Sequence, residues 1–302
     1  MKPILITGGG GFLGAWIARQ LLQKNHRIRI FDLAIQTPIV SEIAGVHAQG
    51  IDWVQGDIRD TAAVERAAAG CHAIIHLAAL LTPPCQSNPV LGAQVNVIGT
   101  LNVFEAAKAH TIKQVVYASS GAVFGSDSGS IPYPMTQYGT FKLACEGSAR
   151  AYWSDAQIAS IGFRPTIVYG PGREVGLTAG ITLACREAVA GQAYTIGFTG
   201  QQDFLYVEDA AAAFVAAALT TYDGAHVFSL AGGTADVTDV IDAIHAVYPA
   251  ARVSAAGPLV PMASVIEHTP YDDVLGEIPK TDLAKGIEKT LAYYRARGIT
   301  RQ

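Results

Sequence analysis

The chain begins with a short apolar segment that runs directly into four consecutive glycines. Residues 3–7 read PILIT, residues 8–11 are all glycine, and residues 12–23 carry apolar side chains at helical spacing. This order predicts a strand, a tight turn and a helix. Because glycine lacks a Cβ, a pyrophosphate can approach the backbone where the helix begins, and the free N–H groups there favour an anion. The segment indicates a dinucleotide-binding turn, with a plain strand-to-helix turn as the alternative.

The glycine turn fits two spacings and is followed by an acidic strand end. Gly8, Gly11 and Gly14 give GxxGxxG, and Gly9 with the last two gives GxGxxG. Asp32 ends the next predicted strand, about twenty residues further on. A carboxylate there can accept hydrogen bonds from both hydroxyls of an adenosine ribose and would repel a 2′-phosphate. Since no arginine follows it directly, the pattern favours NAD over NADP, against the alternative of a turn-initiating aspartate.

The alternation of strands and helices continues along the chain. Further short apolar segments, separated by helical stretches or long connections, occupy residues 27–32, 51–57, 72–79, 113–120 and 156–165. This pattern predicts a doubly wound parallel sheet with helices on both faces, an α/β fold of Rossmann type. Beyond Pro165 the pattern changes to a turn-rich loop, a helix, a strand at 225–233 and a capped helix at 280–298. These later segments predict a small C-terminal lobe set over the sheet.

Composition and charge disfavour several other classes of protein. The 302 residues are 50% hydrophobic and 15% charged, with 25 acidic and 21 basic residues and no long run of either sign. We therefore expect neither a nucleic-acid interface nor an anionic-membrane surface. The four cysteines are far apart and form no CxxC motif, so no metal site and no disulfide framework are expected. No signal peptide precedes the first strand and no apolar run approaches the length of a membrane span, so we expect a cytoplasmic protein.

A tyrosine and a lysine stand four residues apart in the segment TQYGTFKLACE. In a helix, Tyr138 and Lys142 would share one face, as an ordinary amphipathic pair or as an acid–base pair. Ser119 and Ser120 end the predicted strand 113–120. Neighbouring strand residues point to opposite faces, so only one of these serines is expected to reach a site.

These segments follow the order and spacing of a known family. TGGGGFLG, GDIRD, HLAA, NVIGT, YASSGAVFG, YGTFK, RPTIVYGPG and DFLYVEDAA resemble the extended short-chain dehydrogenases/reductases, the NAD-dependent epimerase/dehydratase family, over nearly the whole chain. The resemblance implies an NAD-binding Rossmann domain over residues 1–165, with returning segments near 200–230, and a mainly substrate-binding lobe over 166–302. It also implies a homodimer that pairs helices near 92–109 and 136–153, where apolar residues such as Phe104, Leu143 and Trp153 lie beyond one face.

In that family the YxxxK pair is catalytic, which implies this role for Tyr138 and Lys142. A secondary alcohol loses hydride readily only as its proton leaves, so a base is needed at the oxygen while the nicotinamide lies at the carbon. The lysine ammonium favours the phenolate and holds the nicotinamide ribose. Aligned on the following VFG, Ser120 takes the position of the serine or threonine that contacts the substrate oxygen. Ser119 is then a strand-end hydroxyl that satisfies the backbone.

The resemblance also implies a set of cofactor contacts. We expect NAD to contact Gly8, Gly11, Phe12, Leu13, Gly14, Asp32, Asp57, Ile58, Leu77, Ala78, Ala79, Asn96, Tyr138, Lys142 and Pro165. Asp57 and Ile58 would flank the adenine. Asn96 has a buried packing amide as its alternative, and His76 is expected to be a satisfied core histidine. Arg164 and Asp203 match recurrent family positions and are interpreted as structural.

The chain departs from the nucleotide-sugar members of the family at two places. Ile167 stands where they have an asparagine, and Gln202 stands where they have an arginine that meets the diphosphate. A diphosphate needs positive charge or clustered N–H donors, so that substrate class is placed in doubt. Arg173, in the loop GPGREVG, could grip a substrate carboxylate or phosphate with its planar fork, or be a solvated loop charge.

The expected function is therefore hydride transfer with a small-molecule substrate. We expect an NAD-dependent oxidoreductase acting on a secondary alcohol or ketone of a small hydroxylated compound, sugar-like or a hydroxy acid, in which Ser120 and Arg173 contact the substrate. The alternative is a UDP-sugar 4-epimerase or dehydratase that retains its NAD. A third possibility, a dinucleotide-binding regulator without catalysis, is disfavoured by the intact Ser120, Tyr138 and Lys142.

Overall fold

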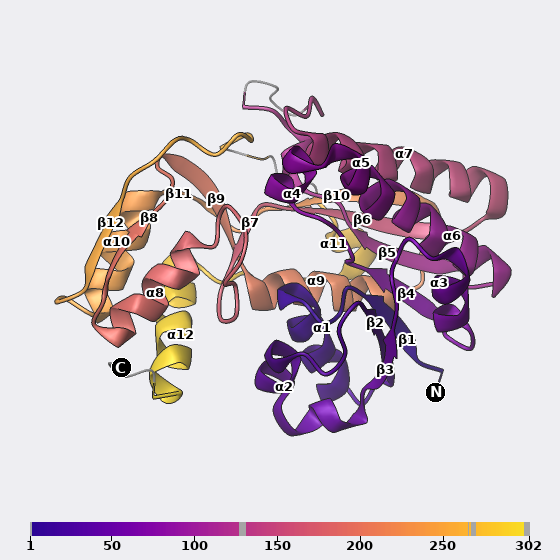
Figure 1. The fold of residues 1–302 in the computed structure, drawn as a ribbon, viewed down its shortest axis with the longest axis horizontal. Coiled ribbons are helices and arrows are strands. Elements are labelled where there is room, and N and C mark those ends of the chain that lie inside the picture. The colour runs from indigo at the N-terminus through magenta and orange to yellow at the C-terminus, as the bar shows by residue number, and fades with distance from the viewer. Residues whose placement is uncertain (1, 127–130, 265, 267–269, 299–302) are drawn as a thin grey trace.

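The computed structural model describes residues 2–126, 131–264, 266 and 270–298. In this part of the chain, seven parallel strands form one sheet in the order β10-β6-β5-β4-β1-β2-β3 (Figure 1). Their bounds are β1 Ile4–Thr7, β2 Ile28–Asp32, β3 Asp52–Gln55, β4 Ala73–His76, β5 Gln114–Ala118, β6 Ala159–Pro165 and β10 Ala225–Leu230. The strand order reverses beside β1, which places a topological switch point between β1 and β4. This is the doubly wound Rossmann-type fold that the sequence predicts.

Helices cover both faces of the sheet because successive residues of each strand point to opposite sides. In β1, Ile4 and Ile6 join the core beneath α1, α2 and α9, and Leu5 joins the core beneath α3, α6 and α7. The bounds of these helices are α1 Phe12–Gln23, α2 Pro38–Ala44, α9 Val207–Leu219, α3 Thr61–Ala68, α6 Gly99–Ala109 and α7 Gln137–Ala156. Both faces are therefore apolar, as a sheet buried on two sides requires.

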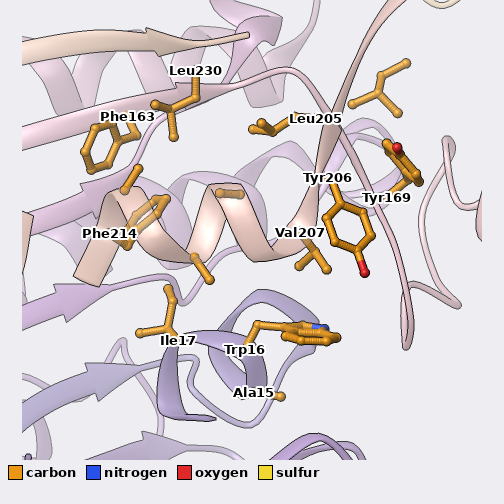
Figure 2. Close-up of a cluster of buried hydrophobic side chains, with 14 of the residues drawn as sticks. Ala15, Trp16, Ile17, Phe163, Tyr169, Leu205, Tyr206, Val207, Phe214 and Leu230 are labelled. Carbon is orange, nitrogen blue, oxygen red and sulfur yellow. The ribbon is translucent and has the colours of Figure 1, made fainter. Parts of the chain in front are cut away.

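Helix α9 ties the sheet to α1. Figure 2 shows Phe214 of α9 beside Phe163 of β6, with Ile17 of α1 on the opposite side of the helix. The rings of Phe163 and Phe214 lie 4.9 Å apart. At the other end of this core, the Trp16 indole donates a hydrogen bond to the carbonyl of Pro171 at 3.0 Å. The sheet domain is thus joined by a polar contact to the loop that follows β7.

The remaining elements build a lobe beside the sheet. In the described residues it holds a three-stranded sheet (β7 Ile167–Tyr169, β9 Gln201–Tyr206, β11 Thr234–Asp236) and a parallel pair (β8 Ala193–Ile196, β12 Arg252–Ala255). Its helices are α8 Gly180–Ala190, α10 Val237–Val247, α11 Asp272–Leu275 and α12 Leu283–Ala296. Helix α12 packs against α8 and α10 (Figure 1). Short turns connect the main elements: η1 Gly45–Gly50, α4 Thr82–Ser87, α5 Pro89–Ala93, η2 Gln94–Ile98 and η3 Gly121–Val123.

Two sequence expectations are corrected by the fold. The strand expected over 156–165 begins only at Ala159, because α7 extends to Ala156 and Gln157 ends it in the left-handed conformation, with φ 53°. Phe104 is fully buried within the chain and stacks on Tyr152, with ring centroids 4.8 Å apart. It is a core residue, so it is unavailable to a dimer seam.

A third correction concerns the membrane. Among the described residues, the helical run Pro89–Ala109 is long and apolar enough, by length and composition, to cross a membrane, with a mean hydropathy of 1.2. Half of the 18-residue stretch of this run that has this hydropathy is buried inside the fold, where α6 packs against α3 and α7. The expectation that no apolar run approaches the length of a membrane span is therefore wrong for this run.

Candidate active site

A cavity of about 650 Å³ lies at the carboxyl ends of the parallel strands, where the lobe meets the sheet. Open α/β sheets bind their ligands at this edge, beside the switch point. All of the predicted site residues except Asn96 line the cavity: Gly8, Gly11, Phe12, Leu13, Gly14, Asp32, Asp57, Ile58, Leu77, Ala78, Ala79, Ser120, Tyr138, Lys142, Pro165 and Arg173. Segments far apart in the sequence are thus brought to one place.

The glycine turn packs directly on the backbone that follows β4. Gly8 has φ 69°, and a Cβ built on it would lie 2.5 Å from the nitrogen of Ala78. A Cβ on Gly14 would lie 2.5 Å from the Cα of Gly9. Helix α1 has no acidic residue in its first turn and no side-chain cap, so its first N–H groups are open to an anion in the cavity. The glycines are required by this close approach and by the left-handed conformation of Gly8.

Asp32 stands beside the glycine turn at the end of β2. Its Oδ2 accepts a hydrogen bond from the backbone N–H of Gly10 at 2.9 Å, and Oδ1 accepts one from Leu33 at 2.7 Å. The Thr37 hydroxyl donates to the carbonyl of Gly10 at 2.8 Å. The turn, the open helix N-terminus and this carboxylate fit the pyrophosphate and the adenosine ribose of NAD.

At the end of β3, Asp57 is bound to Arg59. The guanidinium donates to both carboxylate oxygens at 2.5 to 3.0 Å, and these hydrogen bonds lower the pKa of Asp57. Arg59 also lines the cavity. Its charge is already matched by a carboxylate, which leaves it poorly suited to hold another anion.

Tyr138 and Lys142 occupy the first two turns of α7. The helix begins where the Thr136 hydroxyl accepts a hydrogen bond from the N–H of Gly139 at 3.0 Å. Lys142 is 3% exposed, and its Nζ donates to the carbonyl of Ala118 at 2.7 Å. The same Nζ lies 5.7 Å from the centre of the Tyr138 ring. The ammonium is therefore fixed at the end of β5, next to the phenol.

The two neighbouring serines point to different partners. Ser119 is buried and donates to Glu146 Oε1 at 2.5 Å, and Arg164 binds the same carboxylate through two hydrogen bonds at 2.6 and 2.8 Å. Ser120 is partly exposed and accepts a hydrogen bond from the N–H of Ala122 at 3.1 Å, and its own proton has no acceptor among the residues that the structure describes. The sequence predicts that the Ser119 hydroxyl satisfies the backbone. In the structure its partner is the Glu146 side chain instead.

Asn96 lies outside the cavity wall and fixes a loop that forms part of it. Its Oδ1 accepts from the N–H of Leu80 at 2.9 Å, and its Nδ2 donates to the Leu80 carbonyl at 3.0 Å. Asn96 is 1% exposed and belongs to the π-helical turn Gln94–Ile98 that joins α5 to α6. A direct cofactor contact from Asn96 remains a prediction, since the structure places it behind Leu80.

His76 is a buried histidine with both ring nitrogens paired. Nδ1 lies 2.7 Å from the Thr7 hydroxyl, and Nε2 lies 3.0 Å from that of Thr100. Burial, with a smaller contribution from the Lys142 charge, lowers the pKa of His76 to about 3. The ring is therefore neutral and holds β1, β4 and α6 together.

Asp203 also has structural partners. Its carboxylate accepts a hydrogen bond from the Thr166 hydroxyl at 2.7 Å and one from the N–H of Gly232 at 2.8 Å.

Arg173 enters the cavity from the loop after β7. Its guanidinium lies 5.6 Å from the centre of the Phe12 ring, and its Nε is buried without a hydrogen-bond partner among the described residues. Burial lowers the pKa of Arg173, and the neighbouring Tyr138 opposes that shift. Ile167 also lines the cavity, whereas Gln202 is buried outside its wall.

Several residues of the cavity wall carry no local sequence signal by which they could be selected. These are Leu177, Thr178, Val260, Pro261 and Met262, together with Leu81, Thr82 and Pro83 from the sheet domain. These side chains carry no charge and belong to no motif, and those of the lobe reach the site only because the lobe packs against the sheet.

The Rossmann-type fold and a cavity lined by Ser120, Tyr138 and Lys142 are what an NAD-dependent enzyme requires. Residues 4–231 match the NAD dependent epimerase/dehydratase family, and the chain belongs to that family. NAD is its cofactor.

Relatives include both isomerases and reductases. The chain is 29% identical over 267 residues to a UDP-glucose 4-epimerase of Yersinia pestis, covering 76% of this chain and 78% of that protein. It is 32% identical over 180 residues to a 2-alkyl-3-oxoalkanoate reductase of Stenotrophomonas maltophilia, covering 56% of this chain and only about half, 52%, of the reductase. A solved UDP-N-acetylglucosamine 4-epimerase from Methanobrevibacter ruminantium M1 superposes with a TM-score of 0.86 at 22% identity, covering 98% and 99% of the two chains. This last likeness is one of fold.

Proposed function

We propose that this protein is an NAD-dependent oxidoreductase that transfers hydride at a secondary alcohol or ketone of a small hydroxylated substrate, sugar-like or a hydroxy acid. The observation that carries the proposal is the small number of unpaired Lys and Arg side chains in the cavity wall. NAD brings one diphosphate, and a nucleotide-sugar substrate would bring a second that also needs positive charge. In the described wall, Arg59 is paired with Asp57 and Lys142 is bound to the Ala118 carbonyl, which leaves Arg173. Gln202, in place of a diphosphate-binding arginine, is an uncharged buried amide.

Two arginines that could have compensated are engaged elsewhere. Arg186 is paired with Glu174 at 3.3 Å and with Glu187 at 2.8 Å. Arg252 is exposed and donates to the carbonyl of Gly191 at 3.1 Å. Neither belongs to the cavity wall. A buried diphosphate without ionic partners would be costly, which supports the smaller substrate.

In the proposed reaction, Tyr138 removes the proton from the substrate hydroxyl as the carbon loses hydride. NAD⁺, when bound, accepts that hydride. Lys142 favours the phenolate form of Tyr138, and the Ala118 carbonyl keeps its ammonium in place between turnovers. Ser120 donates a hydrogen bond to the substrate oxygen, since among the described residues its hydroxyl only accepts a hydrogen bond, from the N–H of Ala122. Reduction runs the same steps in reverse, with Tyr138 as the acid.

The second candidate is a UDP-sugar 4-epimerase or dehydratase that retains NAD. It is favoured by the Yersinia pestis relative, which matches over most of both chains. An epimerase returns the hydride to its own intermediate, whereas a dehydrogenase exchanges its cofactor at every turnover. The two candidates therefore differ in how the enzyme holds NAD.

The test offers the purified enzyme NAD⁺ with sugar acids, aldoses and hydroxy acids, and separately with UDP- and GDP-sugars. NADH absorbance reports oxidation, and chromatography reports epimers. We expect NADH to accumulate with a small hydroxylated compound and NAD to be lost on dialysis. Epimerisation of a UDP-sugar by enzyme that keeps its NAD, with no response to any small compound, would establish the second candidate.

We also infer that the protein is a cytoplasmic homodimer that pairs α6 and α7 of two copies. With Phe104 in the core, the seam would rest on the half-buried Trp153 of α7 and on Ile98, 46% exposed, just before α6. Sedimentation at micromolar concentration should give a dimer, and Trp153→Glu should give a monomer with the same fold.

A further inference from the structure

We propose that Arg173 binds a carboxylate of the substrate, so that the enzyme acts on a small hydroxy monocarboxylate in preference to a neutral sugar. The inference rests on the proposed function and narrows it to one substrate class. It follows from three features of Arg173: an unsatisfied buried nitrogen, a firmly held loop, and a place in the wall of the cavity that Tyr138 also lines.

The guanidinium has more hydrogen-bonding capacity than the described chain satisfies. Its Nε is buried and has no partner there, and no described carboxylate forms an ion pair with it. The face of the group lies over the Phe12 ring at 5.6 Å, which supports the cation but does not neutralise it. Arg173 as a whole is only partly buried, but its Nε is fully buried, and an anionic ligand in the cavity would satisfy both that N–H and the unpaired charge.

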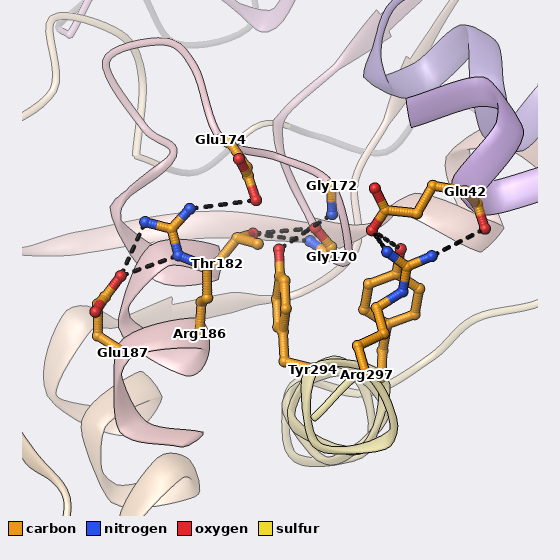
Figure 3. A network of polar contacts seen from close by, with 10 residues as sticks. Glu42, Gly170, Gly172, Glu174, Thr182, Arg186, Glu187, Tyr294 and Arg297 are labelled. Atoms are coloured by element: carbon orange, nitrogen blue, oxygen red, sulfur yellow. Dashed lines mark hydrogen bonds and ion pairs between the residues drawn. The ribbon is translucent and has the colours of Figure 1, made fainter. Parts of the chain in front are cut away.

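The loop that carries Arg173 is anchored on both sides of it. Figure 3 shows Gly170 and Gly172 joined to Thr182 of α8 and Tyr294 of α12. Thr182 Oγ1 bonds the N–H and the carbonyl of Gly170 at 3.1 and 3.2 Å, and the Tyr294 hydroxyl accepts from the N–H of Gly172 at 3.2 Å.

Further contacts fix the same loop to the sheet domain and to α8. Trp16 of α1 holds the carbonyl of Pro171, and Glu174 is paired with Arg186 (Figure 3). The N–H of Arg173 itself donates to the carbonyl of Gly170 at 3.1 Å. The backbone of Arg173 is therefore set before a ligand arrives, and preorganisation of this kind is typical of a binding residue rather than of a solvated loop charge.

The position of Arg173 favours one carboxylate near the reacting carbon. Its planar fork matches the two oxygens of a carboxylate, and Arg173 and Tyr138 both line the same cavity. A carboxylate on Arg173 and a hydroxyl on Tyr138 can belong to one small molecule. The rival ligand is the NAD pyrophosphate, because Phe12 begins α1 where that group binds.

The experiment separates these ligands by measuring NAD affinity and substrate kinetics independently. The wild-type enzyme is first given a hydroxy acid that it oxidises and the primary amide of the same acid. We then compare Arg173→Ala and Arg173→Lys with Arg252→Ala, a control that removes an exposed arginine outside the cavity. NAD dissociation constants are measured by calorimetry without substrate.

We expect the wild type to prefer the acid over its amide by about 10- to 100-fold in kcat/KM, as a lost charge-assisted hydrogen bond predicts. Arg173→Ala should raise KM for the acid by a similar factor, leave the amide and the NAD dissociation constant within about threefold, and recover part of its activity with added guanidinium. Arg173→Lys should be intermediate, and Arg252→Ala should equal the wild type.

Two results would overturn the inference while leaving the proposed function intact. One is an equal kcat/KM of the wild-type enzyme for the hydroxy acid and for its amide. This measurement does not depend on the folding of any variant. The other is weakened NAD binding in Arg173→Ala with an unchanged KM, which would assign the arginine to the cofactor. Failure of the wild type to oxidise any small hydroxylated compound would instead refute the proposed function itself.

Discussion

The hydroxyl of Ser119 donates a hydrogen bond to the carboxylate of Glu146, and this contact joins the end of β5 to helix α7. Glu146 follows Lys142 by one helical turn on α7 and is fully buried. Its carboxylate is also held by Arg164. Ser119 with Glu146, and the proposed catalytic residues Ser120 and Tyr138, therefore come from the same two segments of the chain, the end of β5 and helix α7.

The two serines should respond differently to the same substitution. Ser120→Ala removes the donor to the substrate oxygen, so kcat should fall by about 10- to 1,000-fold with little change in unfolding temperature. Ser119→Ala removes one hydrogen bond from a buried carboxylate, so the free energy of unfolding should fall by about 1–3 kcal/mol. Turnover numbers and thermal unfolding curves of both variants check this. A larger loss of kcat in a well-folded Ser119→Ala would reverse the assignment.

Tyr138→Phe tests the base while keeping the ring. Because only the titrating oxygen is removed, turnover should fall by about 10²- to 10⁴-fold, and the NAD dissociation constant should change only a few-fold. Steady-state rates and calorimetric NAD titrations report the two quantities. Activity near that of the wild type would exclude Tyr138 as the proton acceptor.

Gly8 and Gly45 form a matched pair for the glycine turn. Both have positive φ, 69° and 59°, but a Cβ on Gly8 meets the backbone of Ala78 whereas one on Gly45 meets nothing within 4 Å. Gly45 has φ 59° and ψ −136°, a conformation that residues with a Cβ rarely adopt, so Gly45→Ala should cost only backbone strain, about 1–3 kcal/mol of unfolding free energy. Gly8→Ala should cost more and also abolish NAD binding, since the cavity wall must shift. Equal effects on NAD affinity would show that the close approach is unimportant.

Asp32→Ala tests cofactor choice. Loss of the carboxylate removes an acceptor for the ribose hydroxyls and the charge that repels a 2′-phosphate, so NAD should bind about tenfold more weakly and NADP should bind better. Because Asp32 also holds the N–H groups of Gly10 and Leu33, Asp32→Asn serves as the milder comparison. Titrations with both cofactors measure the change, and a wild-type preference for NADP would contradict our interpretation of β2.

The sequence predicts those site residues whose type is required by the backbone conformation at their own position in the chain. Gly8 and Asp32 can be found because a strand end, a turn and a helix start need those residue types at those positions. Met262 cannot be found in this way, because an uncharged side chain in a loop carries no signal until the lobe has packed. The prediction that Phe104 lies in a dimer seam fails for a related reason: helical spacing shows that an apolar residue lies beyond one face, but not that Tyr152 of another helix covers it.

The buried His76 predicts how stability depends on pH. Its pKa in the folded protein is about 3 against 6.5 for the free side chain, mainly because burial disfavours the charged ring. Between these values the unfolded chain binds more protons than the folded one, so the free energy of unfolding falls as the pH falls from about 6.5 towards 3 and is unaffected above that window. From pH 7 to pH 5 the contribution is about 2 kcal/mol.

His76→Gln should remove this part of the acid sensitivity. The variant will be less stable at pH 7, because the pairs with Thr7 and Thr100 are disturbed, but its stability should decline by about 2 kcal/mol less than that of the wild type between pH 7 and pH 5. The exposed His72, changed to Gln, is the control and should keep the wild-type slope. Urea unfolding at both pH values gives the comparison. An unchanged slope in His76→Gln would mean that carboxylates, not this ring, account for the loss of stability in acid.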